Sequence, residues 1–93
     1  MSTKWQVSPE VLSSKIDEEA ILMSFEAESY FGLDPVGSRI WELLSKKSLT
    51  TDELVVLLME EYEINETTCR EDVQRFIDDM SAKKLIRQVL VST

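Results

Sequence analysis

Carboxylates and a single thiol are the groups through which this sequence could do chemistry. The pairs Glu60-Glu61 and Asp78-Asp79 could bind a cation or share acid–base work, but they miss the spaced oxygen ligands and the glycine of a calcium loop. Cys69 has no identified basic partner, which favours a small buried apolar group over a nucleophile. The chain has no histidine, which removes Ser-His-Asp and Cys-His pairs and ordinary zinc sites. We therefore expect no enzyme, no catalytic residue, no metal and no cofactor.

Size and charge narrow the possible partners. The 93 residues include 18 acidic and 10 basic side chains, so the net charge is −8, and the length is that of one domain over residues 1–93. An acidic surface repels nucleic-acid phosphates and anionic lipids and favours basic ligands. The first residues lack an apolar signal segment, and the longest apolar run has six residues. We expect a cytoplasmic protein with no nucleic-acid or membrane partner.

Three short strands are expected in the first third of the chain. Residues 11–16 and 20–25 are apolar runs on either side of an acidic turn, and residues 30–33 form a third apolar-aromatic run. Together they predict an antiparallel meander. Ile21, Met23 and Phe25 recur at period two, and we expect them to share a buried face.

The rest of the chain has helical patterns with clear start signals. Asp34-Pro35 predicts a helix that ends near Lys46-Lys47, and the capping box from Thr50 to Glu53 predicts a second helix to about Tyr62. A third helix is expected to begin after Asn65 or Thr67 and to end near residues 83–84, followed by a strand or wing over 85–91. The predicted fold class is α+β: a winged-helix-like domain with a three-stranded antiparallel sheet, three helices and a short C-terminal strand.

Winged-helix domains most often bind DNA, and the distribution of charge tests that alternative. Residues 66–84, which would form the recognition helix, hold five acids and four bases, whereas a helix that approaches phosphates should be basic. Residues 10–34 hold seven acids and one base. A DNA-binding regulator is therefore disfavoured by charge, and a small enzyme subunit is disfavoured by the missing histidine. A charged ligand near the strands should be cationic.

The order of short motifs along the chain resembles a known family. It opens with Val7-Ser8-Pro9, continues through Tyr30-Phe31-Gly32-Leu33-Asp34, and then has the helix Gly37-Ser38-Arg39-Ile40-Trp41-Glu42-Leu43-Leu44. Thr50 to Leu54, Asp72-Val73 with Phe76-Ile77, and Leu85-Ile86 follow. The combination resembles PqqD-like domains, the precursor peptide recognition elements of RiPP biosynthesis. The chain departs from the family pattern at Ser29, Asp34 and Lys84, and the last departure leaves the third helix without the glycine that usually ends it.

This resemblance implies a non-catalytic adaptor that binds the leader of a ribosomally made precursor peptide. The leader would add as a strand to the open edge of the third predicted strand, where Gly32 would allow close backbone approach, with side chains entering a groove beside the third helix. The implied peptide-binding residues are Glu28, Ser29, Tyr30, Phe31, Gly32, Leu33, Cys69, Asp72, Val73, Arg75, Phe76, Ile77 and Asp79.

The resemblance also implies partners. A short standalone copy is most similar to leader-binding proteins of lasso-peptide pathways, which work with a leader peptidase and an ATP-dependent cyclase. A PqqD-type peptide carrier for a radical enzyme is the alternative within the family. The acidic strand region would suit a lysine-rich leader.

Overall fold

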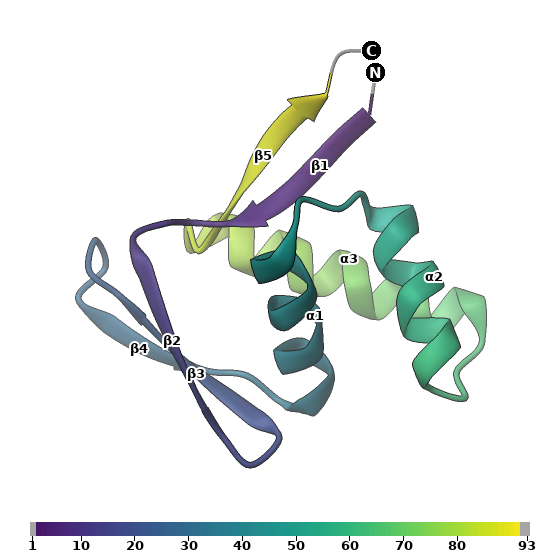
Figure 1. Ribbon diagram of the computed structural model, residues 1–93, viewed down its shortest axis with the longest axis horizontal. Helices are drawn as coiled ribbons and strands as arrows, with labels where there is room; N and C mark the ends of the chain where they lie inside the picture. Colours follow the sequence, from purple (N-terminus) through teal and green to yellow (C-terminus); the bar gives the residue numbers. More distant parts are fainter. Residues whose placement is uncertain (1, 92–93) are drawn as a thin grey trace.

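The computed structural model describes residues 2–91 and contains two small sheets and three helices (Figure 1). Along the chain the elements are β1 (Ser2–Val7), β2 (Val11–Ile16), β3 (Glu19–Ser24), β4 (Ser29–Gly32), α1 (Pro35–Lys46), α2 (Thr51–Glu61), α3 (Glu66–Ala82) and β5 (Ile86–Val91). The expected α+β class, with its meander, three helices and C-terminal strand, is confirmed. No helix within residues 2–91 is long and apolar enough to span a bilayer.

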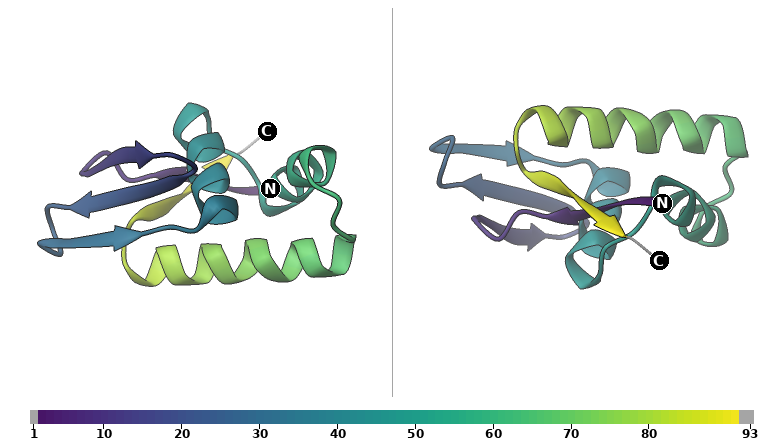
Figure 2. Two further views of the ribbon diagram at one scale, coloured as in Figure 1. Left: turned by 90° about the horizontal axis from the view of Figure 1, so that it is seen from below. Right: turned by 90° about the horizontal axis from the view of Figure 1, so that it is seen from above.

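Strands β2, β3 and β4 form the antiparallel meander that the sequence predicts. The strand order is β2-β3-β4, with Leu12, Met23 and Tyr30 side by side across the sheet. Helix α1 packs on one face of the meander, and the long helix α3 runs beside β4 (Figure 2). Strand β4 therefore lies at an edge of the sheet, close to two helices.

Strand β1 was not expected from the sequence, and it changes the interpretation of the last strand. Residues 2–7 pair with β5 in an antiparallel ribbon, from Ser2 with Val91 to Val7 with Ile86. A backbone bridge between Trp5 and Leu49 ties the ribbon to the start of α2, with N···O distances of 2.7 and 3.0 Å. The C-terminal strand is thus half of a terminal ribbon, and the winged-helix description is not confirmed.

All three helices begin at the caps that the sequence indicates. The Asp34 carboxylate accepts a 2.7 Å hydrogen bond from the Gly37 amide, and the Asn65 side chain accepts one of 2.8 Å from Thr68. The capping box at α2 is complete in both directions between Thr50 and Glu53. The backbone hydrogen bond from Thr50 holds the pKa of Glu53 below its ordinary value.

The prediction that Ile21, Met23 and Phe25 share a buried face is wrong. Ile21 and Met23 share a face of β3, but Ile21 is exposed and Phe25 lies exposed in the turn after β3, while Leu22, Ala20 and Ser24 on the other face are buried. The buried face is the one against α1, where small residues allow close packing. The core that they join consists of Leu33, Ile40, Trp41, Leu44, Leu49, Leu54, Val55, Leu58, Cys69, Val73, Ile77, Met80, Leu85 and Ile86.

Lys84 itself takes the left-handed conformation that a glycine usually adopts after a helix. Its φ is 60°, its amide bonds to the Ser81 carbonyl at 3.0 Å, and the Leu85 amide bonds to the Met80 carbonyl at 2.9 Å. These two bonds form a Schellman motif, which ends α3 and turns the chain into β5. The ending that the family pattern assigns to glycine is therefore built here with a lysine.

Replacing Lys84 with glycine should stabilise the protein. A side chain costs roughly 1 kcal/mol in the left-handed region, so we expect Lys84→Gly to raise the free energy of unfolding by about that amount in urea denaturation. Lys84→Ala is the matched control, because it also removes the exposed 3.6 Å ion pair with Glu26 but keeps a Cβ. Equal stabilities of the two variants would contradict the prediction.

Candidate functional site

The backbone of β4 has one paired edge and one open edge among the described residues. The Leu33 amide donates to the Ala20 carbonyl at 2.9 Å, so Leu33, Phe31 and Ser29 direct their backbone groups at β3. Because these directions alternate along a strand, the N–H and C=O groups of Tyr30 and Gly32 point to the open edge. This edge can accept one more strand.

A serine hydroxyl joins α1 to the end of this strand pair. The Ala20 amide donates to Ser38 Oγ at 2.7 Å, and Ser38 Oγ donates to the Leu33 carbonyl at 3.3 Å. Ser38 is buried, so the hydroxyl replaces the direct bond that the ladder would otherwise make. The strand end and helix α1 are thereby held at a fixed spacing.

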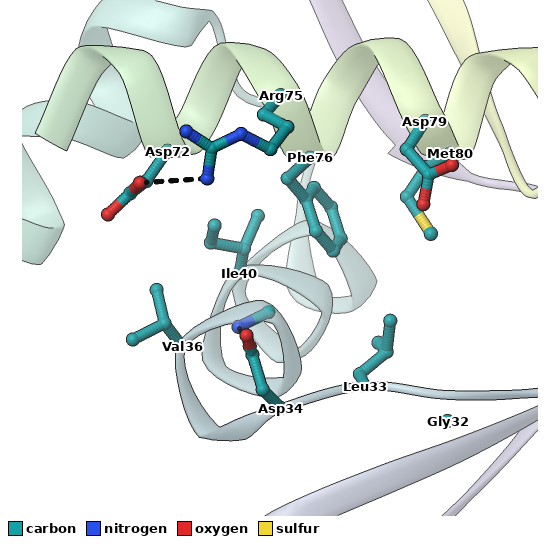
Figure 3. A pocket seen from close by; sticks show the side chains of 11 residues that line it. Gly32, Leu33, Asp34, Val36, Ile40, Asp72, Arg75, Phe76, Asp79 and Met80 are labelled. Carbon is teal, nitrogen blue, oxygen red and sulfur yellow. Dashed lines mark hydrogen bonds and ion pairs between the residues drawn. The ribbon is translucent and has the colours of Figure 1, made fainter. Parts of the chain in front are cut away.

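A groove of about 510 Å³ lies between the end of β4, α1 and α3 (Figure 3). Its floor is mainly apolar, with Ile40 from α1 and Phe76 and Met80 from α3. A Cβ on Gly37 would lie 3.1 Å from the Asp34 carboxylate that caps α1, which is a tight contact, and 3.5 Å from the Phe76 ring, which is an ordinary one, so Phe76 packs directly against α1 at this glycine. The remaining lining residues are Gly32, Leu33, Asp34, Val36, Asp72, Arg75 and Asp79.

The charged residues of α3 at the rim of the groove are largely paired with one another. Asp72 accepts a 3.3 Å bond from Arg75, and Asp79 accepts one of 3.0 Å from Lys83. The Lys83 ammonium also lies 5.1 Å from the centre of the Phe31 ring, a cation–π distance. The groove therefore combines an apolar floor, a rim whose carboxylates are paired with bases or cap a helix, and an open strand edge, which suits an extended peptide better than a small charged substrate.

Comparison with known families matches residues 19–86 to the family described as coenzyme PQQ synthesis protein D, PqqD. The chain belongs to the PqqD family. The matched range runs from the start of β3 to the start of β5, so it includes the open edge and every residue that lines the groove. No curated protein sequence matches the chain.

Two solved structures resemble this PqqD-family chain over most of its length. TbiB1 in complex with the TbiA(beta) leader peptide is 34% identical, with a TM-score of 0.81 over 92% of this chain and 99% of that chain. A lasso peptide synthetase B1 complexed with its leader peptide is 17% identical, with a TM-score of 0.76 over 89% and 96% of the two chains. The second likeness concerns the fold alone.

The structure separates the site residues expected from the sequence into three groups. Gly32, Leu33, Asp72, Arg75, Phe76 and Asp79 line the groove. Glu28, Ser29, Tyr30 and Phe31 belong to β4 or the turn before it, where Tyr30 points away from the groove. Cys69, Val73 and Ile77 are at most 1% exposed and lie in the core of this PqqD domain, so the expectation that they form groove wall needs correction.

Cys69, Val73 and Ile77 cannot contact a bound peptide in this conformation, because they are buried. Cys69 Sγ lies 3.8 Å from the Val55 carbonyl, and burial raises the pKa of its thiol, so Cys69 is a packing residue. The wall contributed by α1, which holds Val36, Gly37 and Ile40, is not among the site residues expected from the sequence. Gly37 was the available signal, since a glycine inside a helix usually has a packing reason.

Proposed function

We propose that this chain is a non-catalytic adaptor that binds the leader of a ribosomally synthesised precursor peptide in lasso-peptide biosynthesis. The observation that carries the proposal is the open edge of β4 beside an apolar groove, in a chain similar to TbiB1, which is known in complex with a leader peptide. The unit that acts is a single domain over residues 1–93, in the cytoplasm.

Strand addition explains how such a site can bind peptides of varied sequence. The outward-pointing backbone groups of Tyr30 and Gly32 would pair with the peptide backbone, which supplies affinity without reading side chains. Alternate peptide side chains would point toward α3 and enter the groove over Phe76 and Met80. The selectivity for one leader over another would then depend on which apolar side chains of the peptide fit into the groove.

The partners follow from this role. An adaptor without catalytic groups must deliver its cargo, and we propose the leader peptidase and the ATP-dependent cyclase of the same pathway as recipients. The acidic side chains of residues 10–34, seven against one base, favour a leader that is rich in lysine. No cofactor or metal is part of the proposal.

A second function is supported by the family match. PqqD is described by its part in coenzyme PQQ synthesis, so a peptide carrier for a radical enzyme of such a pathway is the alternative. Both functions use the same edge and groove. They differ in the precursor that is bound, and a comparison of the two leaders separates them.

Titration with labelled leader peptides tests the proposed function. We expect saturable binding, by fluorescence anisotropy, of the leader encoded beside the gene, with weaker binding of a scrambled leader of the same composition. Raising the salt concentration from about 0.05 to about 0.5 M should weaken binding of a lysine-rich leader, because surface charges are then screened. Absence of saturation at high micromolar protein for the neighbouring leader would contradict the proposal. Tight binding of a PQQ precursor leader only would favour the alternative.

A further inference from the structure

The meander has an apolar face that nothing in the described chain covers. Helix α1 packs on the opposite face, so the side chains that alternate outward remain in solvent. We call this surface the outer face. It consists of Leu12, Ile16, Ile21, Met23 and Tyr30, and four of these side chains are between 37% and 73% exposed.

Four of these residues are neighbours in the sheet. Leu12, Met23 and Tyr30 are register partners and form a row across all three strands. Ile21 lies in the next row, between Ser14 and Gly32. A Cβ on Gly32 would meet no atom within 4 Å, so the missing side chain is not required by packing and leaves Ile21 uncovered. A continuous exposed apolar surface of this kind is typical of protein interaction sites.

Acidic residues frame the patch at both ends. The β2–β3 hairpin carries Asp17, Glu18 and Glu19, and the β3–β4 hairpin carries Glu26 and Glu28. Of these five acids, the structure pairs only Glu26 with a base, Lys84, over the described residues. The one base within β2–β4, Lys15, points to the other face and binds Glu42 of α1 at 3.2 Å. The outer face thus has apolar side chains at its centre and acidic side chains at both ends.

We propose that the outer face docks a second protein whose contact surface has apolar anchors surrounded by lysine and arginine. Such a surface would bury the exposed row while its cations meet the hairpin carboxylates. A second copy of this chain would instead place acidic hairpins against acidic hairpins. An anionic membrane would be repelled by the same carboxylates.

The docking surface is separate from the groove. A peptide strand would lie in the plane of the sheet at the β4 edge, whereas the docked protein would cover the face opposite α1. Both sites can therefore be occupied at once, as an adaptor requires. The surface is inferred from apolar exposure and charge, and the choice of the leader peptidase and cyclase as probes rests on the proposed function.

A pair of matched double variants tests the proposal. Leu12→Gln with Ile16→Gln changes the outer face on β2, the strand at the opposite edge of the sheet from β4. Val56→Gln with Met59→Gln changes an exposed apolar surface on α2 and serves as control. The probes are the purified leader peptidase and the purified cyclase encoded with the precursor, titrated separately against each variant. Melting temperatures establish that both variants are folded.

We expect at least one enzyme to bind the wild-type chain, and the outer-face variant to weaken this binding about tenfold or more. The α2 control should change it less than about twofold, and high salt should weaken the wild-type complex. All variants should keep the leader affinity of the wild-type chain, which separates failure of this proposal from failure of the proposed function. Failure of both enzymes to bind would overturn the proposal, as would equal losses in the two variants. Sedimentation that shows a dimer lost only in the outer-face variant would assign the face to a second copy and also overturn it.

Discussion

Gly32→Pro is expected to weaken leader binding about tenfold or more while the protein stays folded. The Gly32 N–H points to the open edge of β4, so proline removes a donor that only an added strand would use. The proline ring would also occupy space at the edge where the peptide backbone must approach. Loss of one hydrogen bond worth about 1.4 kcal/mol corresponds to the tenfold effect. Anisotropy titration measures the affinity, and thermal melting measures the stability.

The neighbouring residue provides the control for this experiment. The Phe31 N–H points to β3, so Phe31→Pro should break the ladder and lower the melting temperature, unlike the change at Gly32. A folded Gly32→Pro variant with wild-type affinity would rule out strand addition at β4. A Gly32→Pro variant as unstable as Phe31→Pro would show that the backbone directions assigned to β4 are wrong.

Ser38→Ala is expected to lower the free energy of unfolding by about 1–3 kcal/mol. The hydroxyl links the Ala20 amide and the Leu33 carbonyl, and its removal leaves two buried backbone groups without that partner. We further expect weaker leader binding, since the same hydroxyl fixes the spacing between α1 and the strand end. Urea denaturation measures the first effect, and peptide titration measures the second.

Ser45 is the matched control on the same helix. Its hydroxyl donates to the Trp41 carbonyl at 2.8 Å, one turn back in α1, where the carbonyl already has helical partners. Ser45→Ala should therefore change stability by less than about 0.5 kcal/mol. Equal effects of the two substitutions would mean that Ala20 and Leu33 pair directly once the hydroxyl is gone.

Helix boundaries could be predicted from the sequence because their signals are local. Asp34 with Pro35, Thr50 with Glu53, and Asn65 each act through a hydrogen bond to a residue three positions later. Such bonds depend on a few neighbouring residues, so the first two caps are where the sequence places them, and the third is Asn65, one of the two positions that the sequence left open.

Features that depend on distant residues could not be predicted in the same way. Strand β1 has a mostly polar sequence, and it is a strand because it pairs with β5 and with Leu49, both distant in the sequence. Period-two spacing correctly placed Ile21 and Met23 on one face, but the pattern cannot say which face α1 covers. The contact between Ala20 and Ser38 decides that question, and it joins residues from different elements.

Part of the candidate site could not be predicted from the sequence, because the helix rotation that exposes some residues and buries others depends on packing. Local patterns predicted a third strand over residues 30–33, and the resemblance to PqqD-like domains implied that its edge is open, as the strand order shows. On α3, the distinction between the buried Val73 and the groove-lining Phe76 is a rotation of less than one helical turn. Apolar spacing alone cannot set that rotation, because both residues belong to the same stripe.

The terminal ribbon has a consequence for how the chain folds. Ser2 pairs with Val91, so β1 can pair only after nearly the whole chain has been made. Strands β2, β3 and β4 instead pair with their neighbours along the chain. Contacts between distant residues form late because the loop they close is long. During synthesis the meander and its edge would assemble first, and closure of the ribbon would be the last step of folding.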